Sequence, residues 1–428
     1  MTNKGWKIYK IDNICEVLSS KRIFAADYVK FGIPFYRSKE IIEKAFGENI
    51  SNLLYIAEEK YNDIKSKYGV PKENDILISA VGERSGIPYL VRNEEFYFKD
   101  GNLIWIRNFD DRKIFSKYLC YWFKSKIGQF TLENLMIGSA QKALTIVGIK
   151  GIELNLPPLE VQNKIAKVLS ALDNKIELNN AINNNLEQQA QAIFKSWFVD
   201  FEPFGGTMPK FAELVPIEKI CKIVTKGTTP TTLGFSFVEQ GINFIKAESI
   251  LDNHSFDYNK FAYIDEVTYK KLSRSILEPK DIVFTIAGTL GRFAIIDEEV
   301  IPANTNQAVA IIRADIGKIE PEYLYTFFLG NWHNNYYSKR IQQAVQANLN
   351  LTTIKSLPII LLSQEYRIKY LNIIKPILWQ IKYNEKENRI LTQLRDTLLP
   401  KLMSGEIDVS KVDIDDILEN QSADKLSF

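Results

Sequence analysis

The sequence predicts an α+β fold that is built twice, each copy being a globular domain followed by a long helix. Three observations support this: similar residues recur 205 positions apart, strand-like runs fill the first part of each copy, and apolar heptads fill the second. A period this long describes whole domains rather than the short units of a solenoid. We expect two globular α+β domains joined by two long helices that pair as a coiled coil, with a pseudo-two-fold internal repeat.

The repeat is clearest where the helices are expected. Asn179 and Asn384 each follow an isoleucine by three residues and lie 205 positions apart. The same or a nearly equal offset relates four further pairs of segments: 141–144 and 346–349, 149–150 and 354–355, 11–15 and 217–221, and 75–78 and 281–284.

The globular parts contain short runs of β-branched and aromatic residues separated by Gly, Pro and Asn, a composition typical of strands bounded by turns. The clearest runs are Ile76–Ser79, Leu103–Arg107, 282–286 and 308–312, and polar helical stretches such as Glu58–Lys67 lie between them. This mixture predicts an α+β globule, whereas the order of its strands does not follow from the pattern.

A heptad pattern starts at Ile165 and holds for more than four heptads. Its seam positions in the first copy are Ile165, Leu169, Leu172, Ile176, Asn179, Asn183, Leu186, Ala190, Ile193 and Trp197. Those in the second copy are Tyr370, Ile374, Ile377, Ile381, Asn384, Asn388, Leu391, Arg395, Leu398 and Leu402. A helix over 160–199 is roughly 60 Å long and needs a partner of similar length, which the second copy supplies.

Four asparagines occupy this seam. An unpaired amide in an apolar seam costs free energy, so these side chains either pair across the seam or lie where it opens to solvent. Pairing is favoured because both copies keep their amides at the same positions, and polar seam residues fix register. If the helices are antiparallel, Asn179 faces Asn388 and Asn183 faces Asn384, and the numbers in each pair sum to 567. A slip by one heptad is the competing register.

Pro376 breaks the symmetry of the helices, since the first copy has Ala171 at this position. A proline inside a helix removes one hydrogen bond and clashes with the carbonyl four residues earlier, here that of Asn372. We expect either a kink at Pro376 or a new helix that begins there.

Composition excludes several classes of protein. The chain has 428 residues, 46% of them hydrophobic, so it can bury sizeable cores, and its net charge of +2 neither indicates nor excludes a nucleic-acid partner. Cys15, Cys120 and Cys221 are far apart, which predicts neither a disulfide framework nor a metal site. His254 and His333 are expected to be exposed or half-buried rather than metal ligands. No signal-like or membrane-spanning apolar run is present, so we expect a soluble cytoplasmic protein.

Catalytic and cofactor motifs are missing from the sequence. We find no phosphate-binding P-loop, no GxGxxG fingerprint and no Asp/Asn-Pro-Pro-aromatic methyltransferase motif, and the single Pro-Pro pair at 157–158 lies between leucines. The sequence therefore predicts a chain that is not itself an enzyme and that binds no cofactor and no metal.

Several motifs resemble those of the specificity subunits of type I restriction–modification systems. They are LPPLEVQNKI at 156–165, LDNKI at 172–176, FKSWFVDF at 194–201 and LRDTLLPKLMSGEI at 394–407. The resemblance covers nearly the whole chain and is strongest in the helical regions. It departs at 359–365, where the second copy lacks the double proline of the first.

This resemblance implies two target-recognition domains at opposite ends of two antiparallel helices, which read the two half-sites of a bipartite double-stranded DNA target. It also implies partners: two modification (adenine-methyltransferase) subunits that carry S-adenosylmethionine, and often two restriction subunits that carry ATP. The boundaries we expect are 1–155 for the first recognition domain, 156–203 for the central helix, 204–358 for the second domain, 359–405 for the C-terminal helix and 406–428 for an acidic tail.

Candidate DNA-contacting residues are those that can neutralise phosphates or read base edges from loops that follow strand-like runs. In the first domain they are Arg37, Ser38, Lys39, Glu83, Arg84, Ser85, Ser139, Gln141 and Lys142. In the second domain they are Lys246, Glu248, Thr289, Arg292, Gln346 and Asn348. Any one of these residues can equally be a solvated loop residue, whereas the loops taken as a set favour DNA contact.

Two other functions are weighed against DNA recognition. A fused nuclease–methyltransferase would need the missing motifs, whereas a coiled-coil scaffold joining two protein-binding domains would need none of them. If modification subunits dock on the outward faces of the helices, the candidate anchors are Val168, Ile182, Phe194 and Phe198. Phe194 and Phe198 can equally pack against the recognition domains.

Overall fold

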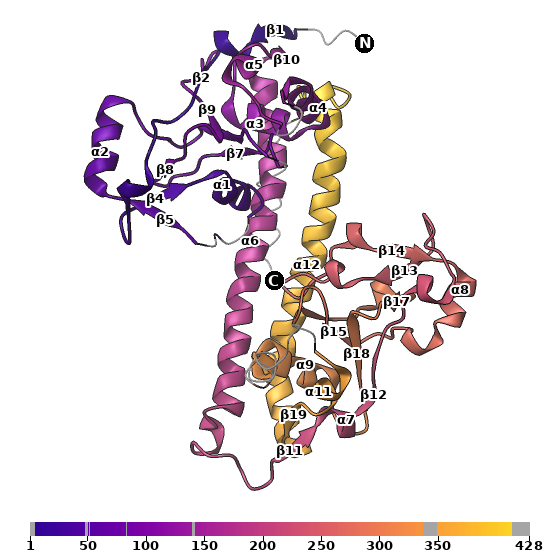
Figure 1. Ribbon diagram of the computed structural model, residues 1–428. Helices are drawn as coiled ribbons and strands as arrows, with labels where there is room; N and C mark the ends of the chain where they lie inside the picture. Colours follow the sequence, from indigo (N-terminus) through magenta and orange to yellow (C-terminus); the bar gives the residue numbers. More distant parts are fainter. Residues whose placement is uncertain are drawn as a thin grey trace. The chain divides into compact units, whose positions relative to one another are not determined.

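The computed structural model describes residues 5–47, 50, 52–82, 84–138, 142–334, 336 and 349–412 (Figure 1). The chain divides into two compact units. The first comprises residues 1–178 together with 387–428, and the second comprises Asn179–Lys386. Each unit therefore contains one globular domain and one half of each long helix.

The domain of the first unit is built on two four-stranded sheets. The antiparallel sheet has the order β2 (Glu16–Leu18), β9 (Leu103–Arg107), β6 (Ile76–Ser79), β7 (Pro88–Leu90). The mixed sheet has the order β3 (Tyr28–Val29), β5 (Leu54–Ile56), β4 (Ile33–Tyr36), β8 (Tyr97–Phe98), and β1 (Lys7–Lys10) pairs separately with β10 (Glu153–Leu156). The short helices are α1 (Ser38–Ala45), α2 (Glu58–Lys67), α3 (Ser116–Lys124), α4 (Lys126–Leu135) and α5 (Ile146–Lys150).

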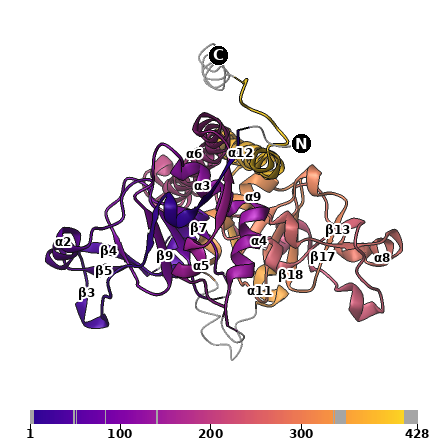
Figure 2. The same cartoon turned by 90° about the horizontal axis from the view of Figure 1, so that it is seen from above.

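Strand β6 shows why these runs form a central sheet. All four of its residues are buried, and successive side chains of a strand point to opposite faces. Ile76 and Ile78 enter the core that contains α3 and the long helix, while Leu77 packs with Trp105 in a second core. Seen from above, the unit is layered outward from the long helix α6 (Leu159–Phe198) through α3, the two sheets and α2 (Figure 2).

The domain of the second unit repeats this topology, except that its second sheet has three strands instead of four. Its antiparallel sheet has the order β12 (Cys221–Lys226), β18 (Val309–Ala314), β15 (Ile282–Thr285), β16 (Phe293–Ile295). Its three-stranded sheet has the order β14 (Ala262–Ile264), β13 (Ile242–Ile245), β17 (Ala303–Thr305), and β11 (Glu213–Pro216) pairs with β19 (Pro358–Leu361). The helices of this domain are α7 (Ile217–Ile220), α8 (Glu266–Lys271), α9 (Pro321–Leu329) and α11 (Leu351–Lys355).

The repeat extends to the register of the strands. Ile76 pairs with Ile106 in the first unit, and Ile282 pairs with Ile312 in the second. Ile282 lies 206 positions after Ile76, and Ile312 lies 206 positions after Ile106. The predicted α+β fold and its internal repeat are confirmed at the level of individual strand pairs.

Two long helices complete the units. The predicted helix over 160–199 is confirmed as α6, with 40 residues, and the second copy forms α12 (Gln364–Ser404), with 41 residues. The expectation that a new helix begins at Pro376 is wrong, because α12 runs through this residue. Tyr370, Leu371 and Ile374 are buried in the turns before Pro376, and their packing holds the helix despite the missing hydrogen bond.

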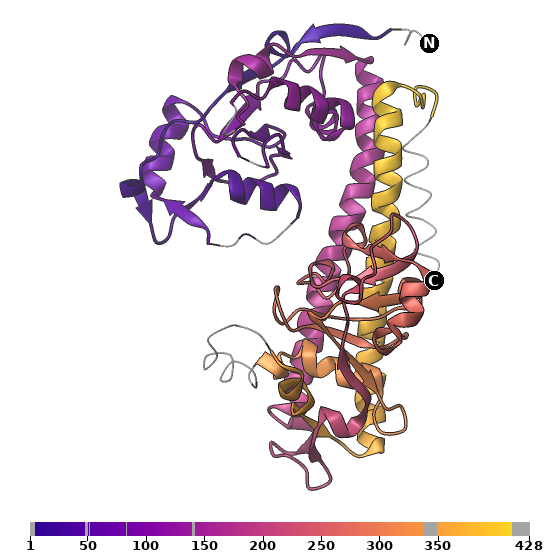
Figure 3. The same ribbon diagram turned by 45° about the vertical axis from the view of Figure 1, so that its right-hand side comes forward.

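The halves of α6 and α12 within each unit lie side by side and run antiparallel (Figure 3). In the first unit Arg395 Nη1 donates to Asp173 Oδ1 at 2.9 Å, and Lys175 Nζ lies 2.9 Å from Glu387 Oε2. In the second unit the rings of Trp197 and Tyr370 lie 5.3 Å apart. Within each unit, later residues of α6 therefore contact earlier residues of α12, which is the antiparallel arrangement that a two-fold-related pair of helices requires.

A buried amide pair lies in the second unit. Asn384 Nδ2 donates to Asn183 Oδ1 at 2.7 Å, and Asn183 Nδ2 donates to the Ile381 carbonyl at 3.2 Å. Both asparagines are less than a tenth exposed. This hydrogen bond and the Trp197–Tyr370 contact both correspond to the register in which residue numbers sum to 567. The facing of Asn179 and Asn388 stays a prediction.

The amide pair can be tested by truncating one partner. Asn384→Ala removes a hydrogen-bond donor and leaves the buried Asn183 oxygen with less polar contact, so we expect the free energy of unfolding to fall by about 1–3 kcal/mol. Denaturant-induced unfolding of the full chain measures this. Asn184→Ala, at an exposed position of α6 next to Asn183, is the matched control, and equal stability of the two variants would contradict the role given to the pair.

Candidate nucleic-acid interface

The glycine turn after β6 is the centre of the first candidate surface. The Gly82 amide donates to the Lys142 carbonyl at 3.4 Å, and Val81 forms a β-bridge with Ala143. The Arg84 guanidinium lies 4.9 Å from the ring centre of Phe46, at the C-terminal end of α1. Arg84 and Lys142 are both exposed. The structure therefore brings two of the three predicted loops together and leaves two cations on their surface.

The second domain repeats this arrangement. Thr289 Oγ1, in the glycine turn after β15, donates to the Ala247 carbonyl at 3.4 Å, so this turn meets the segment that carries Lys246 and Glu248. The Leu349 amide donates to the Ile286 carbonyl at 3.1 Å, which attaches the third segment of the group. In both domains the glycine turn thus meets the third segment, and in the second domain it also meets the segment at Lys246.

Arg37, Ser38 and Lys39 lie at the opposite end of α1 from Phe46, so they are not joined directly to the Arg84 turn. Arg37 donates to Glu40 through its guanidinium and its backbone amide. Burial raises the pKa of the Glu40 carboxyl, but the hydrogen bonds from Arg37 outweigh it and hold that pKa below its ordinary value. Lys39 is exposed beside Glu43, 3.5 Å away, whereas the Ser38 hydroxyl is enclosed with no partner among the described residues.

Arg292 is also held within the protein. Its guanidinium donates to both Asp252 oxygens, at 2.7 and 2.6 Å, and to the Ile250 carbonyl at 3.1 Å. The Asp252 side chain is 81% exposed and that of Arg292 is 24% exposed, so this ion pair lies at the protein surface. Lys246 lies 3.4 Å from Glu248, and Ser85 donates to the Met136 sulfur at 3.3 Å. Glu83, Ser139, Gln141, Gln346 and Asn348 lie outside the described residues.

A family model described as the type I restriction modification DNA specificity domain matches residues 3–188 and 209–395. The chain belongs to this family. It is a non-catalytic specificity subunit with two target-recognition domains, and DNA recognition follows from the family. The two matched stretches begin 206 residues apart, in agreement with the repeat in the sequence and in the strand registers.

Similar proteins cover most of the chain. The MjaIX specificity subunit of Methanocaldococcus jannaschii is 27% identical over 70% of this chain and 71% of its own length. The HindI specificity subunit of Haemophilus influenzae is 28% identical over 62% of this chain and 71% of its own length. The crystal structure of a specificity subunit from M. genitalium has a TM-score of 0.60 at 17% identity, covering 94% of this chain and 97% of that one, which shows a shared fold.

The two histidines of this specificity subunit serve packing. His333 is 1% exposed among Phe284, Phe293 and Phe328, so the expectation of an exposed or half-buried imidazole is wrong for it. The His254 ring stacks on Phe293 at 3.9 Å, and burial lowers the pKa of each histidine to about 4. Within the described ranges, no group of three or more His, Cys, Asp or Glu side chains could hold a metal ion.

No helix in the described part of the chain combines the length and the apolar character needed to cross a membrane.

Two of the four candidate anchors for partner subunits are wrong. Phe194 and Phe198 are each 1% exposed and belong to the core of the second recognition domain, where both rings contact Phe327. A Cβ atom added to Gly330 would lie 2.2 Å from the Phe194 ring, so the domain is shaped around this side chain. Val168 is half-buried against the first core, whereas Ile182 is 37% exposed.

Each recognition domain is also joined to its long helix by an ion pair that sequence reasoning missed. Arg92, after β7, pairs with Glu177 of α6 in the first unit. Asp297, after β16, pairs with Lys382 of α12 at 2.5 Å in the second unit. These positions are related by the offset of 205, and the charges are reversed. Searching the repeat for positions of opposite charge would have found them.

We predict that Lys142 contributes a phosphate contact. Lys142→Ala should weaken the binding of target and non-target DNA equally, and the slope of log affinity against log salt should fall by about 0.9, as expected for one lost contact. Fluorescence anisotropy on the assembled methyltransferase at several salt concentrations measures both. Lys67→Ala, on α2, is the control, because the Lys67 ammonium is exposed and pairs with Asp63 at 2.6 Å. Identical behaviour of the two variants would remove Lys142 from the DNA surface.

Proposed function

We propose that this specificity subunit reads a bipartite DNA target, one half-site with each recognition domain. The observation that carries the proposal is the duplication itself. Each domain has an antiparallel sheet with the same strand order, and each gathers a glycine turn and a neighbouring loop on one surface. The loop sequences differ between the copies, with Gly82–Gly86 in the first and Gly288–Gly291 in the second, so the two surfaces suit different base sequences.

The basic side chains of these surfaces divide into two kinds. Lys142 and Arg84 are exposed and suit phosphate contacts. Arg37 and Arg292 are oriented by carboxylates, and an arginine held in a fixed direction suits bidentate recognition of guanine. Phosphate contacts position the protein on the duplex, while oriented base contacts select the sequence.

The same proposal places the chemistry on partner subunits that dock on the long helices. The modification subunits would bring S-adenosylmethionine, and the restriction subunits would bring ATP. Support for docking comes from apolar side chains on the helices that are exposed in the described part of the chain. In the first unit these are Leu178 of α6, 55% exposed, with Ile390 and Leu394 of α12, 54% and 45% exposed. Exposed apolar side chains grouped on a helix are typical of an interaction surface.

Domain exchange tests the reading of half-sites. Replacing residues 1–155 with the same region of a relative that has a different target should change one half of the methylated motif and leave the other half unchanged. Exchange of 204–358 is the reciprocal control and should alter only the other half. If either exchange changed both halves, the domains would not read independently.

Substitution of the exposed helix residues tests docking. Ile390→Asp with Leu394→Asp places two charges on this surface, and desolvating them in an apolar interface is costly, so we expect co-purification of the modification subunits to be lost. The melting temperature of the isolated chain should change little, because both positions are exposed. Gln393→Asp, between them in sequence and exposed, is the control. Full retention of the partner by the double variant would rule out this surface.

A further inference from the structure

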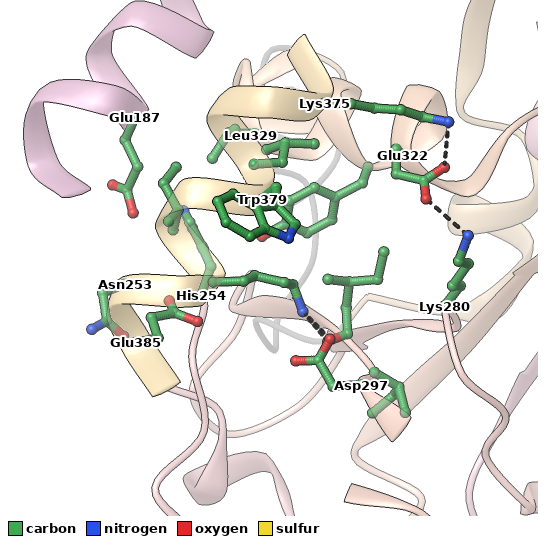
Figure 4. Close-up of a pocket in the computed structure, with 16 residues that line it drawn as sticks. Glu187, Asn253, His254, Lys280, Asp297, Glu322, Leu329, Lys375, Trp379 and Glu385 are labelled. Atoms are coloured by element: carbon green, nitrogen blue, oxygen red, sulfur yellow. Dashed lines mark hydrogen bonds and ion pairs between the residues drawn. The ribbon is translucent and has the colours of Figure 1, made fainter. Parts of the chain in front are cut away.

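A cavity of about 290 Å³ lies in the second unit, where the recognition domain meets its helix. Its walls come from α9, from α12, from Glu187 of α6, and from the loop that carries Asn253 and His254. Figure 4 shows Glu187 and Glu385 at one end and the ion pairs of Glu322 at the other, with Trp379 between them. This volume is close to the lower limit for pockets that bind small organic molecules.

The lysines of the cavity are already paired. Lys280 and Lys375 lie 3.1 and 3.8 Å from the two oxygens of Glu322, and Lys382 lies 2.5 Å from Asp297. Four carboxylates thus face three ammonium groups. Within the described residues, the Glu187 carboxylate has no hydrogen-bond or ion-pair partner, and burial raises its pKa to about 7. When Glu187 is ionised, the cavity therefore has one negative charge without a counter-charge.

Other groups indicate how a ligand would be held. Burial raises the pKa of the Tyr325 hydroxyl well above its ordinary value, and the charges of Glu385, Glu187 and Asp297 raise it further, so carboxylates surround this hydroxyl. Trp379 is 64% exposed and stacks on Tyr383 at 5.4 Å. An indole face attracts a cation, and a buried carboxylate attracts it more strongly.

The fold does not require these groups, because the first copy lacks them. At the positions related by 205 residues, Thr392 corresponds to Glu187 and Asn180 to Glu385, while Asn174 corresponds to Trp379. A purely structural feature would be expected in both copies, as the strand registers are. The acidic aromatic cavity is therefore specific to the second unit.

We propose that this cavity binds an organic cation with a flat or apolar body, with Glu187 as its counter-charge and Trp379 against its face. Two sources have this chemistry: a small amidine or amine, and a lysine or arginine side chain of a docked subunit. Either occupant would contact the recognition domain and α12 together.

Benzamidine and its neutral isostere benzamide are suitable probes. We expect the full chain to bind benzamidine about tenfold more tightly than benzamide in ligand-observed NMR titrations. Only benzamidine carries a positive charge that can pair with the Glu187 carboxylate and contact the Trp379 ring. Glu187→Gln, which keeps the shape, should remove this preference, and Trp379→Ala should weaken binding of both. Glu160→Gln, an exposed site near the start of α6, is the control and should change nothing.

Binding should also depend on pH in a defined direction. Ionised Glu187 attracts the cation, so benzamidine should bind more tightly as pH rises through about 7. The other ionisable groups that line the cavity are Glu385, Lys382, Asp297, Lys280, Glu322, Lys375, Tyr325 and His254. Burial lowers the pKa of His254 to about 4 and raises that of Tyr325 well above its ordinary value. These two therefore do not produce the change.

The assembled complex distinguishes the two sources. If a partner side chain fills the cavity, the complex should exclude benzamidine, and Glu187→Gln should weaken assembly. If the ligand is a small molecule, the complex should still bind benzamidine, and assembly should be unaffected. Failure of benzamidine to bind the full chain, equal binding of benzamide, or unchanged binding by Glu187→Gln would each overturn the proposal. None of these results depends on DNA recognition.

Discussion

The long helices are part of the recognition domains, and the rest of the structure depends on this shared core. Ile165 and Leu169 of α6 are buried with the sheet and α3 of the first domain. Phe194 and Phe198, further along the same helix, are buried in the core of the second. Burying side chains of this size contributes about 1.5–3 kcal/mol each, so a domain cannot leave its helix without losing much of its own stability. The helices therefore orient the surfaces that we propose to meet DNA.

Ion pairs add orientation to this apolar attachment. The Arg92–Glu177 and Asp297–Lys382 pairs join equivalent points of domain and helix, but with reversed charge. Both pairs are partly exposed, and such pairs contribute about 0–1 kcal/mol. The ion pairs are too weak to hold a domain on its helix, but they are strong enough to favour one orientation of the domain. Reversed charges also make each domain a poorer partner for the other domain's helix, where like charges would meet.

The sequence predicted the repeated architecture well because heptads and the offset of 205 are long, regular signals. It predicted the candidate surface only in part. Glycine turns are visible in sequence, so the positions of Arg84 and Thr289 beside neighbouring loops could be anticipated. The pairing of Arg292 with Asp252 could not be anticipated, because it depends on how two loops approach in space. Arg37 and Glu40 are only three residues apart at the start of α1, and sequence reasoning missed this local pair. Phe194 and Phe198 were ambiguous for a similar reason: an apolar residue off the seam fits a partner subunit or the chain's own domain equally well. Pro376 was misjudged in part because tertiary packing outweighs a local helix-breaking preference.

The central claim is that two repeated domains, held by one helix pair, read two separate half-sites for a methyltransferase. Single-molecule methylome sequencing of a host with and without this gene tests it most directly. The account predicts that deletion abolishes methylation at a single motif made of two specific blocks separated by a non-specific spacer of fixed length. An unchanged methylome, or loss of methylation at one uninterrupted block, would contradict it.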